Sequence, residues 1–134
     1  MGTPDARAAR PLSPHLSVYR FLFTMLMSIV HRITGAALYF GTILLVWWLV
    51  ALASGPEAYA TASWFFASWL GRLILFGYTW ALLHHMFGGL RHFIWDTGRG
   101  FDEVSRLRLS QWSLIASVLL TFGLWVVGYA TMGF

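Results

Sequence analysis

The sequence contains no cysteine, and its positive charges are all arginines because lysine is also absent. Without cysteine the chain cannot form disulfides, bind zinc through thiolates or hold an iron–sulfur cluster on thiolate ligands. Charged residues are scarce too, at 10% of the 134 residues, whereas a soluble domain carries roughly 25%. Any metal bound by this chain therefore has to be held by histidine or by oxygen ligands.

Apolar residues take the place of the missing charges. Hydrophobic residues make up 58% of the chain, and the mean hydropathy is +0.66. These values indicate an integral membrane protein that is embedded in the lipid bilayer. The net charge of +4 comes from arginines that lie mostly outside the apolar segments. This charge therefore bears on membrane topology, and no nucleic acid is expected as a partner.

Three apolar segments predict an all-α membrane protein with three transmembrane helices. They run from about 21 to 53, from about 59 to 95 and from about 109 to 132. About 20 apolar residues suffice to cross the hydrocarbon core, so the second segment is long enough to tilt or protrude. A Ser-Gly-Pro-Glu turn at 54–57 separates the first two segments, and a charged connection at 97–109 separates the last two.

The distribution of arginine predicts the orientation of the chain. Residues 1–20 form a polar arm that lacks the apolar core of a secretory signal and is a poor transit peptide. Arginines precede the first span and surround the second connection: Arg7, Arg10, Arg20, Arg91, Arg99, Arg106 and Arg108. Positive charge marks the cytoplasmic side, so we expect a cytoplasmic arm and a periplasmic carboxyl terminus. We expect residues 1–134 to form one domain in a bacterial inner membrane.

The end of the second span, residues 84–96, holds three histidines, an arginine and an aspartate. His85 and His92 are seven residues apart and share a helix face, with Gly88 and Gly89 between them. Glycine inside a helix costs about 1 kcal/mol relative to alanine, so the pair predicts a bulky group near the backbone, such as a haem held by histidine. The alternative is a set of hydrogen-bonded interface histidines with glycines that serve close helix packing.

A second polar cluster lies near the start of the first span. Ser28 and Arg32 are four residues apart and share a face, while His31 points about 100° away from Arg32. A hydroxyl and a guanidinium can bind a carbonyl oxygen and stabilise negative charge that develops on it. Ser28 could instead bond to its own helix. Arg32 needs a partner inside the membrane, and Asp96 is the obvious one in this chain.

Three stretches of the sequence resemble the larger membrane anchor, the cytochrome b subunit, of succinate dehydrogenase (respiratory complex II). Their order and separation match the family, and they cover most of the chain. The first stretch is similar to the alphaproteobacterial and mitochondrial version. The stretches are Arg10-Pro11-Leu12-Ser13-Pro14-His15-Leu16, Ser28-x-x-His31-Arg32-x-Thr34-Gly35 and His85-x-x-x-Gly89-Leu90-Arg91-His92-x-x-Trp95-Asp96-x-Gly98.

The resemblance implies that His85 is an axial ligand of a haem b shared with a second small membrane subunit, which supplies the other ligand. It places His31, His92 and Arg91 around the haem propionates. His84 is a departure from the family pattern, and it makes the ligand ambiguous by one residue. We prefer His85 because it keeps the spacing to the glycine and histidine of the third stretch.

The resemblance also implies that Ser28, Arg32 and Asp96 line a ubiquinone site. FAD and the iron–sulfur clusters would belong to a soluble flavoprotein subunit and an iron–sulfur subunit, and the membrane pair would anchor both. This chain would then be half of a heterodimeric anchor that does not itself oxidise succinate. The alternatives are the anchor of a quinol:fumarate reductase, a self-contained dihaem cytochrome, which would need four axial ligands of its own, and a non-redox small membrane protein.

Overall fold

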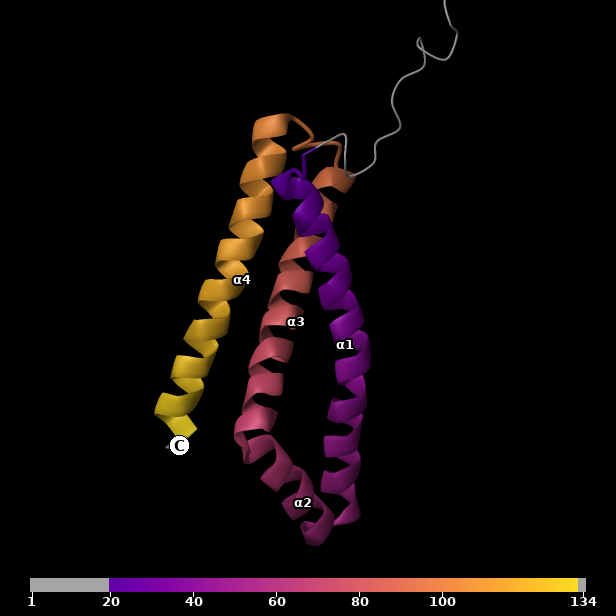
Figure 1. Cartoon of the computed structure of the whole chain (residues 1–134), viewed down its shortest axis with the longest axis vertical. Helices are drawn as coiled ribbons and strands as arrows, with labels where there is room; N and C mark the ends of the chain where they lie inside the picture. The colour runs from indigo at the N-terminus through magenta and orange to yellow at the C-terminus, as the bar shows by residue number, and fades with distance from the viewer. Residues whose placement is uncertain (1–19, 133–134) are drawn as a thin grey trace, which may run out of the picture.

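The structure, a computed structural model, describes residues 20–132, and all regular secondary structure in that range is helical. The helices are α1 (Phe23–Ser54), α2 (Pro56–Ala67), α3 (Trp69–Asp96) and α4 (Glu103–Met132). Three of them, α1, α3 and α4, are long and apolar enough to cross a membrane (Figure 1). The predicted all-α membrane protein with three spans is therefore confirmed. The predicted arm lies outside the described residues except for Arg20.

The structure differs from the single helix predicted for 59–95, because the chain breaks at Ser68. Ser68 has an extended backbone, its hydroxyl accepts a hydrogen bond from the Gly71 N–H at 3.1 Å, and it donates one to the carbonyl of Phe65 at 2.6 Å. A Cβ at Gly71 would overlap that same carbonyl. Ser68 therefore caps α3, and the short α2 is a separate helix.

The predicted turn at 54–57 joins α1 to α2. Gly55 has φ +119°, a conformation that side-chain-bearing residues rarely adopt, and Pro56 occupies the first turn of α2. From this turn α2 runs back along the last part of α1 (Figure 1). Aromatic rings line the contact, with Trp47 5.5 Å from Phe65 and Trp48 6.4 Å from Tyr59 between ring centroids.

The connection between α3 and α4 is tight and polar. Gly98 and Gly100 have positive φ angles, and the Trp95 indole N–H donates to the carbonyl of Gly100 at 3.1 Å. Asp102 begins α4 by accepting a hydrogen bond from the Ser105 N–H at 2.9 Å. Hydrogen bonds from the side chain and backbone of Ser105 lower the pKa of Asp102. Asp102 thus acts as the amino-terminal cap of α4.

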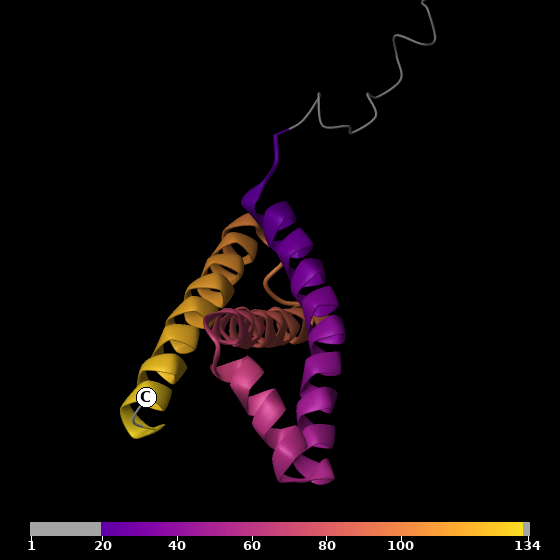
Figure 2. The ribbon, with the colours of Figure 1, turned by 60° about the horizontal axis from the view of Figure 1, so that its bottom comes forward.

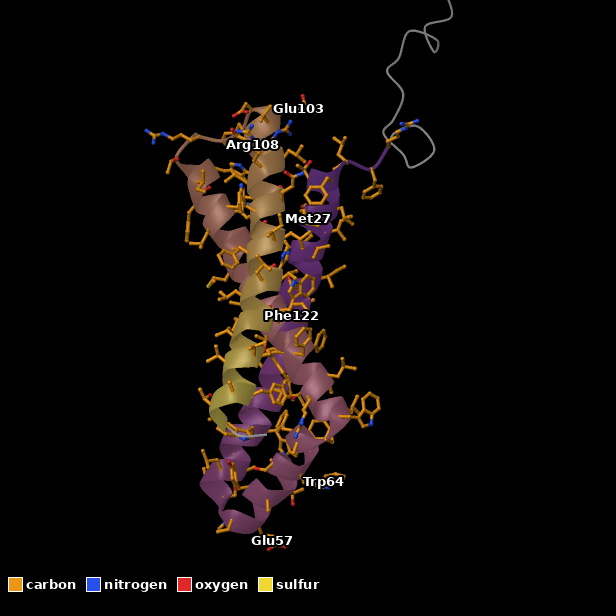
Figure 3. The ribbon with its side chains drawn as sticks, turned by 90° about the vertical axis from the view of Figure 1, so that its left-hand side faces the viewer. Met27, Glu57, Trp64, Glu103, Arg108 and Phe122 are labelled. Atoms are coloured by element: carbon orange, nitrogen blue, oxygen red, sulfur yellow. The ribbon has the colours of Figure 1, made fainter. Side chains whose placement is uncertain are left out.

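Helix α3 is the centre of the bundle and contacts the three other helices. Figure 2 looks nearly along α3, with α4 on one side and α1 on the other. The charged Glu103 and Arg108 lie at one end of the molecule and Glu57 at the other, with Met27 and Phe122 between them (Figure 3). Few apolar side chains are buried among the described residues, and many large ones are exposed. This pattern is expected of spans whose outer faces meet lipid or other membrane helices.

Candidate functional site

Helices α1 and α3 are joined by a reciprocal contact between His31 and His85. The two imidazole rings stack with centroids 4.0 Å apart and planes 10° from parallel. The His31 Nε2–H donates to the carbonyl oxygen of His85 at 3.3 Å, and the His85 Nδ1–H donates to the carbonyl oxygen of His31 at 3.1 Å. A carbonyl can only accept, so each bond fixes which ring nitrogen carries the proton. In a neutral His85 this leaves Nε2 with a free lone pair on a partly exposed side chain.

Two glycines make room for these rings. A Cβ at Gly88 would overlap the His31 ring, and a Cβ at Gly35 would lie 2.9 Å from Cε1 of His85. The bulky group that approaches Gly88 is therefore His31 of this same chain. Gly89 is different, because a Cβ there would meet nothing within 4 Å among the described residues. One turn after His85, the surface of α3 is thus open to a group from outside.

Gly88→Ala is expected to lower the free energy of unfolding by about 1 to 3 kcal/mol, because the added methyl group displaces the His31 ring. Thermal unfolding of the purified protein in its native assembly, followed by circular dichroism, measures the effect. The matched control is Gly77→Ala on the same helix, where a Cβ meets nothing within 4 Å and helix propensity improves. Equal unfolding midpoints for the two variants would contradict the close contact between Gly88 and the His31 ring.

His92 and Asp96 continue the face of α3 that carries His85. The His92 ring is exposed and lies 5.5 Å from His31 and 5.1 Å from Trp95 between centroids. Asp96 is exposed at the last position of α3. The structure therefore brings His31, His85 and His92 together as one cluster of imidazoles at the end of the bundle where α1 begins.

Ser28 and Arg32 lie on the exposed surface of α1, next to this cluster in the sequence. Within residues 20–132, Ser28 makes no hydrogen bond to its own helix, whereas the Thr34 hydroxyl donates to the carbonyl of His31 at 2.9 Å. The predicted ion pair between Arg32 and Asp96 is not formed in this part of the chain. Both residues are exposed instead.

Arg91 and His84 lie about 100° around α3 from His85, and they face α4. Arg91 is 4% exposed, and its Nη1 donates to the hydroxyls of Ser110 at 3.1 Å and Ser113 at 3.4 Å. His84 is 1% exposed, with Nδ1 3.3 Å from the Ser117 hydroxyl. Arg91 therefore lies on a different face from the imidazole cluster, and the side chain of His84 is enclosed.

Helix α4 contributes four buried hydroxyl side chains that were not predicted from the sequence to belong to the site. Ser110, Ser113, Ser117 and Thr121 are all buried against the bundle. Their spacing of three, four and four residues places them on one stripe of a helix. A polar stripe in an otherwise apolar span is the sequence feature that could have predicted a polar interface on α4. It could not by itself identify Arg91 and His84 as the side chains that meet it.

Two cavities lie nearer the other end of the bundle. One of about 640 Å³ is lined by residues of all four helices, among them Arg72 and Tyr129, whose ring centroid is 5.9 Å from Cζ of Arg72. The other, of about 330 Å³, is lined mainly by apolar side chains of α1 and α3. Neither cavity is lined by Ser28, Arg32 or His85. Ser28 and Arg32 are exposed on α1, and His85 is partly exposed on α3.

Comparison with known proteins gives concordant matches. Residues 6–125 match the family described as "Succinate dehydrogenase/Fumarate reductase transmembrane subunit". The chain is 47% identical over 114 residues to the succinate dehydrogenase cytochrome b556 subunit of Paracoccus denitrificans, covering 85% of this chain and 88% of that protein. It is 37% identical to the b556 subunit of Rickettsia prowazekii, covering 87% and 91%. It is 36% identical to the mitochondrial b560 subunit of Sus scrofa, covering 86% and 69%.

Proposed function

Because this chain belongs to the family of succinate dehydrogenase/fumarate reductase transmembrane subunits, as a cytochrome b subunit, we propose that it holds a haem b together with a second small membrane subunit and forms part of a ubiquinone site. It is a multi-pass protein of the inner membrane and a membrane-anchor subunit of succinate dehydrogenase. As an anchor it does not itself oxidise succinate. In this proposal a flavoprotein subunit and an iron–sulfur subunit dock at the cytoplasmic end, where α1 begins.

The geometry of His85 supports its assignment as the haem ligand. A haem-ligating histidine commonly donates its second ring N–H to a backbone carbonyl, which fixes the tautomer and the ring orientation. The His85 Nδ1–H donates in this way to the carbonyl of His31, and Nε2 keeps its lone pair. Gly89, one turn further on, leaves space beside the backbone for a flat group. The residues present therefore fit a haem at this position.

His84 fits the same role poorly. Its ring is enclosed between α3 and α4 at 1% exposure, so an iron ligated there would require the two helices to separate. His31 already uses Nε2 to donate to His85, and it suits a supporting position beside the haem, as does the exposed His92. Arg91 would act from the neighbouring face as a buried positive charge.

We assign the ubiquinone site to Ser28 and Arg32, with Asp96 nearby. The Ser28 hydroxyl has no partner in its own helix, so it is available to donate to a quinone carbonyl. The exposed Arg32 guanidinium can stabilise negative charge that develops on a quinone oxygen as electrons arrive. A haem b at His85 would supply a one-electron carrier beside this site. The second membrane subunit and the iron–sulfur subunit would complete the surface.

The observation that carries the proposal is the His31–His85 contact in a chain of this family. Anchors of quinol:fumarate reductases share the family description, and the direction of the reaction would depend on the partner subunits and the quinone. The relatives compared above are all named for succinate dehydrogenase, and this favours succinate oxidation. A non-redox membrane protein is disfavoured by the family match itself.

Purification of the tagged chain from its own membranes in a mild detergent tests the proposal. We expect three further subunits, a b-type band in the dithionite-reduced minus oxidised spectrum, and succinate-dependent reduction of a short-chain ubiquinone. A chain that purifies with succinate dehydrogenase activity but without the band would overturn the haem assignment. A chain that purifies with neither would overturn the whole proposal.

A further inference from the structure

The interface between α3 and α4 encloses polar atoms without protein partners. Trp80 stacks on His84 with ring centroids 5.2 Å apart and planes 26° from parallel. Among the described residues, Trp80 Nε1 and His84 Nε2 are both buried and have no hydrogen-bond partner. His84 is 1% exposed. Buried polar atoms of native proteins are nearly always paired, so these two nitrogens require a ligand.

The hydrogen-bonding roles of the two nitrogens are opposite. The Ser117 hydroxyl donates to the carbonyl of Leu114 at 2.8 Å, so its oxygen accepts from Nδ1–H of His84 at 3.3 Å. In a neutral imidazole with the proton on Nδ1, Nε2 is an acceptor. The Trp80 indole Nε1–H can only donate. Because the two rings lie 5.2 Å apart between centroids, one ligand that both accepts and donates can satisfy both atoms.

Chemistry and access narrow the identity of this ligand. A metal cation cannot accept from the Trp80 N–H, and a simple anion cannot donate to His84 Nε2. A side chain of another subunit cannot reach a residue that is 1% exposed unless α3 and α4 separate. A water molecule donates and accepts, and internal waters in proteins typically bridge polar groups of this kind.

We propose that one buried water molecule bridges Trp80 and His84, accepting a hydrogen bond from Nε1–H and donating one to Nε2. With Ser117 on the other ring nitrogen, both nitrogens of His84 are then engaged inside the α3–α4 interface. The bond to Ser117 joins His84 to α4, and the water keeps the lone pair of His84 away from competing ligands. This inference does not depend on the proposed function, because it uses only contacts within the chain.

A density map of the purified complex, at a resolution that shows ordered waters, tests the bridge directly. We expect a peak within hydrogen-bonding distance of Trp80 Nε1 and His84 Nε2, and its loss in the Trp80→Phe variant. A map that shows a protein group bonded to either nitrogen, or no peak between them, overturns the proposal.

A double-mutant cycle of Trp80→Phe and His84→Phe tests it independently, by thermal unfolding of the complex. Both substitutions keep an aromatic ring, so a pair of rings remains at these positions in every variant. The loss of the Ser117 bond involves His84 alone and cancels in the cycle. With a bridging water, the double variant should lose less than the sum of the single variants, by about 2 to 4 °C in the unfolding midpoint. Additive losses would overturn the bridge.

The control cycle pairs His84→Phe with Trp125→Phe. The Trp125 indole N–H donates directly to the Thr79 hydroxyl at 3.3 Å, and no hydrogen bond or ring contact joins Trp125 to His84 among the described residues. These two losses should add. Coupling of equal size in both cycles would indicate a general loosening of the α3–α4 interface, and it would overturn the assignment to one water.

Discussion

His85→Leu is expected to abolish the b-type haem band of the purified complex, whereas His84→Leu should leave it in place. In our proposal His85 supplies one of two axial ligands, and leucine has no atom that can replace the imidazole nitrogen. The His85 Nδ1–H bond to the carbonyl of His31 already holds the ring in the tautomer that a ligand needs. The measurement is the reduced minus oxidised visible spectrum, normalised to total protein.

His84→Leu is the matched control because the two histidines are adjacent on the same helix. It removes the bond to Ser117 and a buried ring, so it should lower stability while leaving the haem ligand in place. Size-exclusion chromatography of both variants separates loss of haem from loss of assembly. A band that disappears with His84→Leu and survives His85→Leu would shift the site by one residue and contradict the ligand assignment.

The three spans were predictable because a membrane crossing depends on length and composition alone. The break at Ser68 was not, because serine is unremarkable in an apolar segment and a helix cap depends on the local backbone. Ser68 ends α2 because its hydroxyl caps α3 and because Gly71 packs against the carbonyl of Phe65. The turn at Gly55 and Pro56, by contrast, carries its own sequence signal.

The candidate site was predicted in part. The spacing of His85 and His92 placed them on one face, and the resemblance grouped His31 with His92. In the structure the His31 ring contacts both of these histidines from the neighbouring helix. The sequence treats Gly88 and Gly89 alike. Among residues 20–132, however, the His31 ring occupies the space beside Gly88, whereas nothing lies within 4 Å of a Cβ built at Gly89. That distinction depends on the rotation of α1 against α3, which no spacing within one helix specifies.

Arg91 illustrates the same limit. The resemblance grouped Arg91 with His31 and His92 around the haem, but residues next to each other on a helix, such as Arg91 and His92, differ by about 100° in direction. Arg91 is buried against the serines of α4, and the guanidinium is held there by hydroxyls instead of by a carboxylate. A hydroxyl-lined interface between membrane helices can hold a cation in this way because the hydroxyls supply hydrogen-bond acceptors that hydrocarbon lacks.

Ser28→Ala is expected to reduce kcat/KM for ubiquinone about 10- to 100-fold, with the haem spectrum unchanged. A hydrogen bond to a developing charge is worth roughly 1.5 to 3 kcal/mol, which corresponds to this range of rates. Ser28 has no hydrogen bond to its own helix, so its removal should cost little stability. Arg32→Gln should have an effect at least as large, because it removes positive charge near the quinone oxygen.

Thr42→Ala on the same helix is the control for Ser28→Ala. Its hydroxyl is exposed but already donates to the carbonyl of Leu38 at 2.8 Å, so its loss should not affect quinone reduction. Succinate oxidation measured with a soluble artificial acceptor should be unchanged in all three variants, because our proposal assigns that reaction to the partner subunits. Equal quinone activity in Ser28→Ala and Thr42→Ala would remove Ser28 from the site. Loss of the haem band in Ser28→Ala would contradict this division of roles. The Ser28 hydroxyl on α1 would then be needed for the haem that, in our proposal, His85 holds from α3.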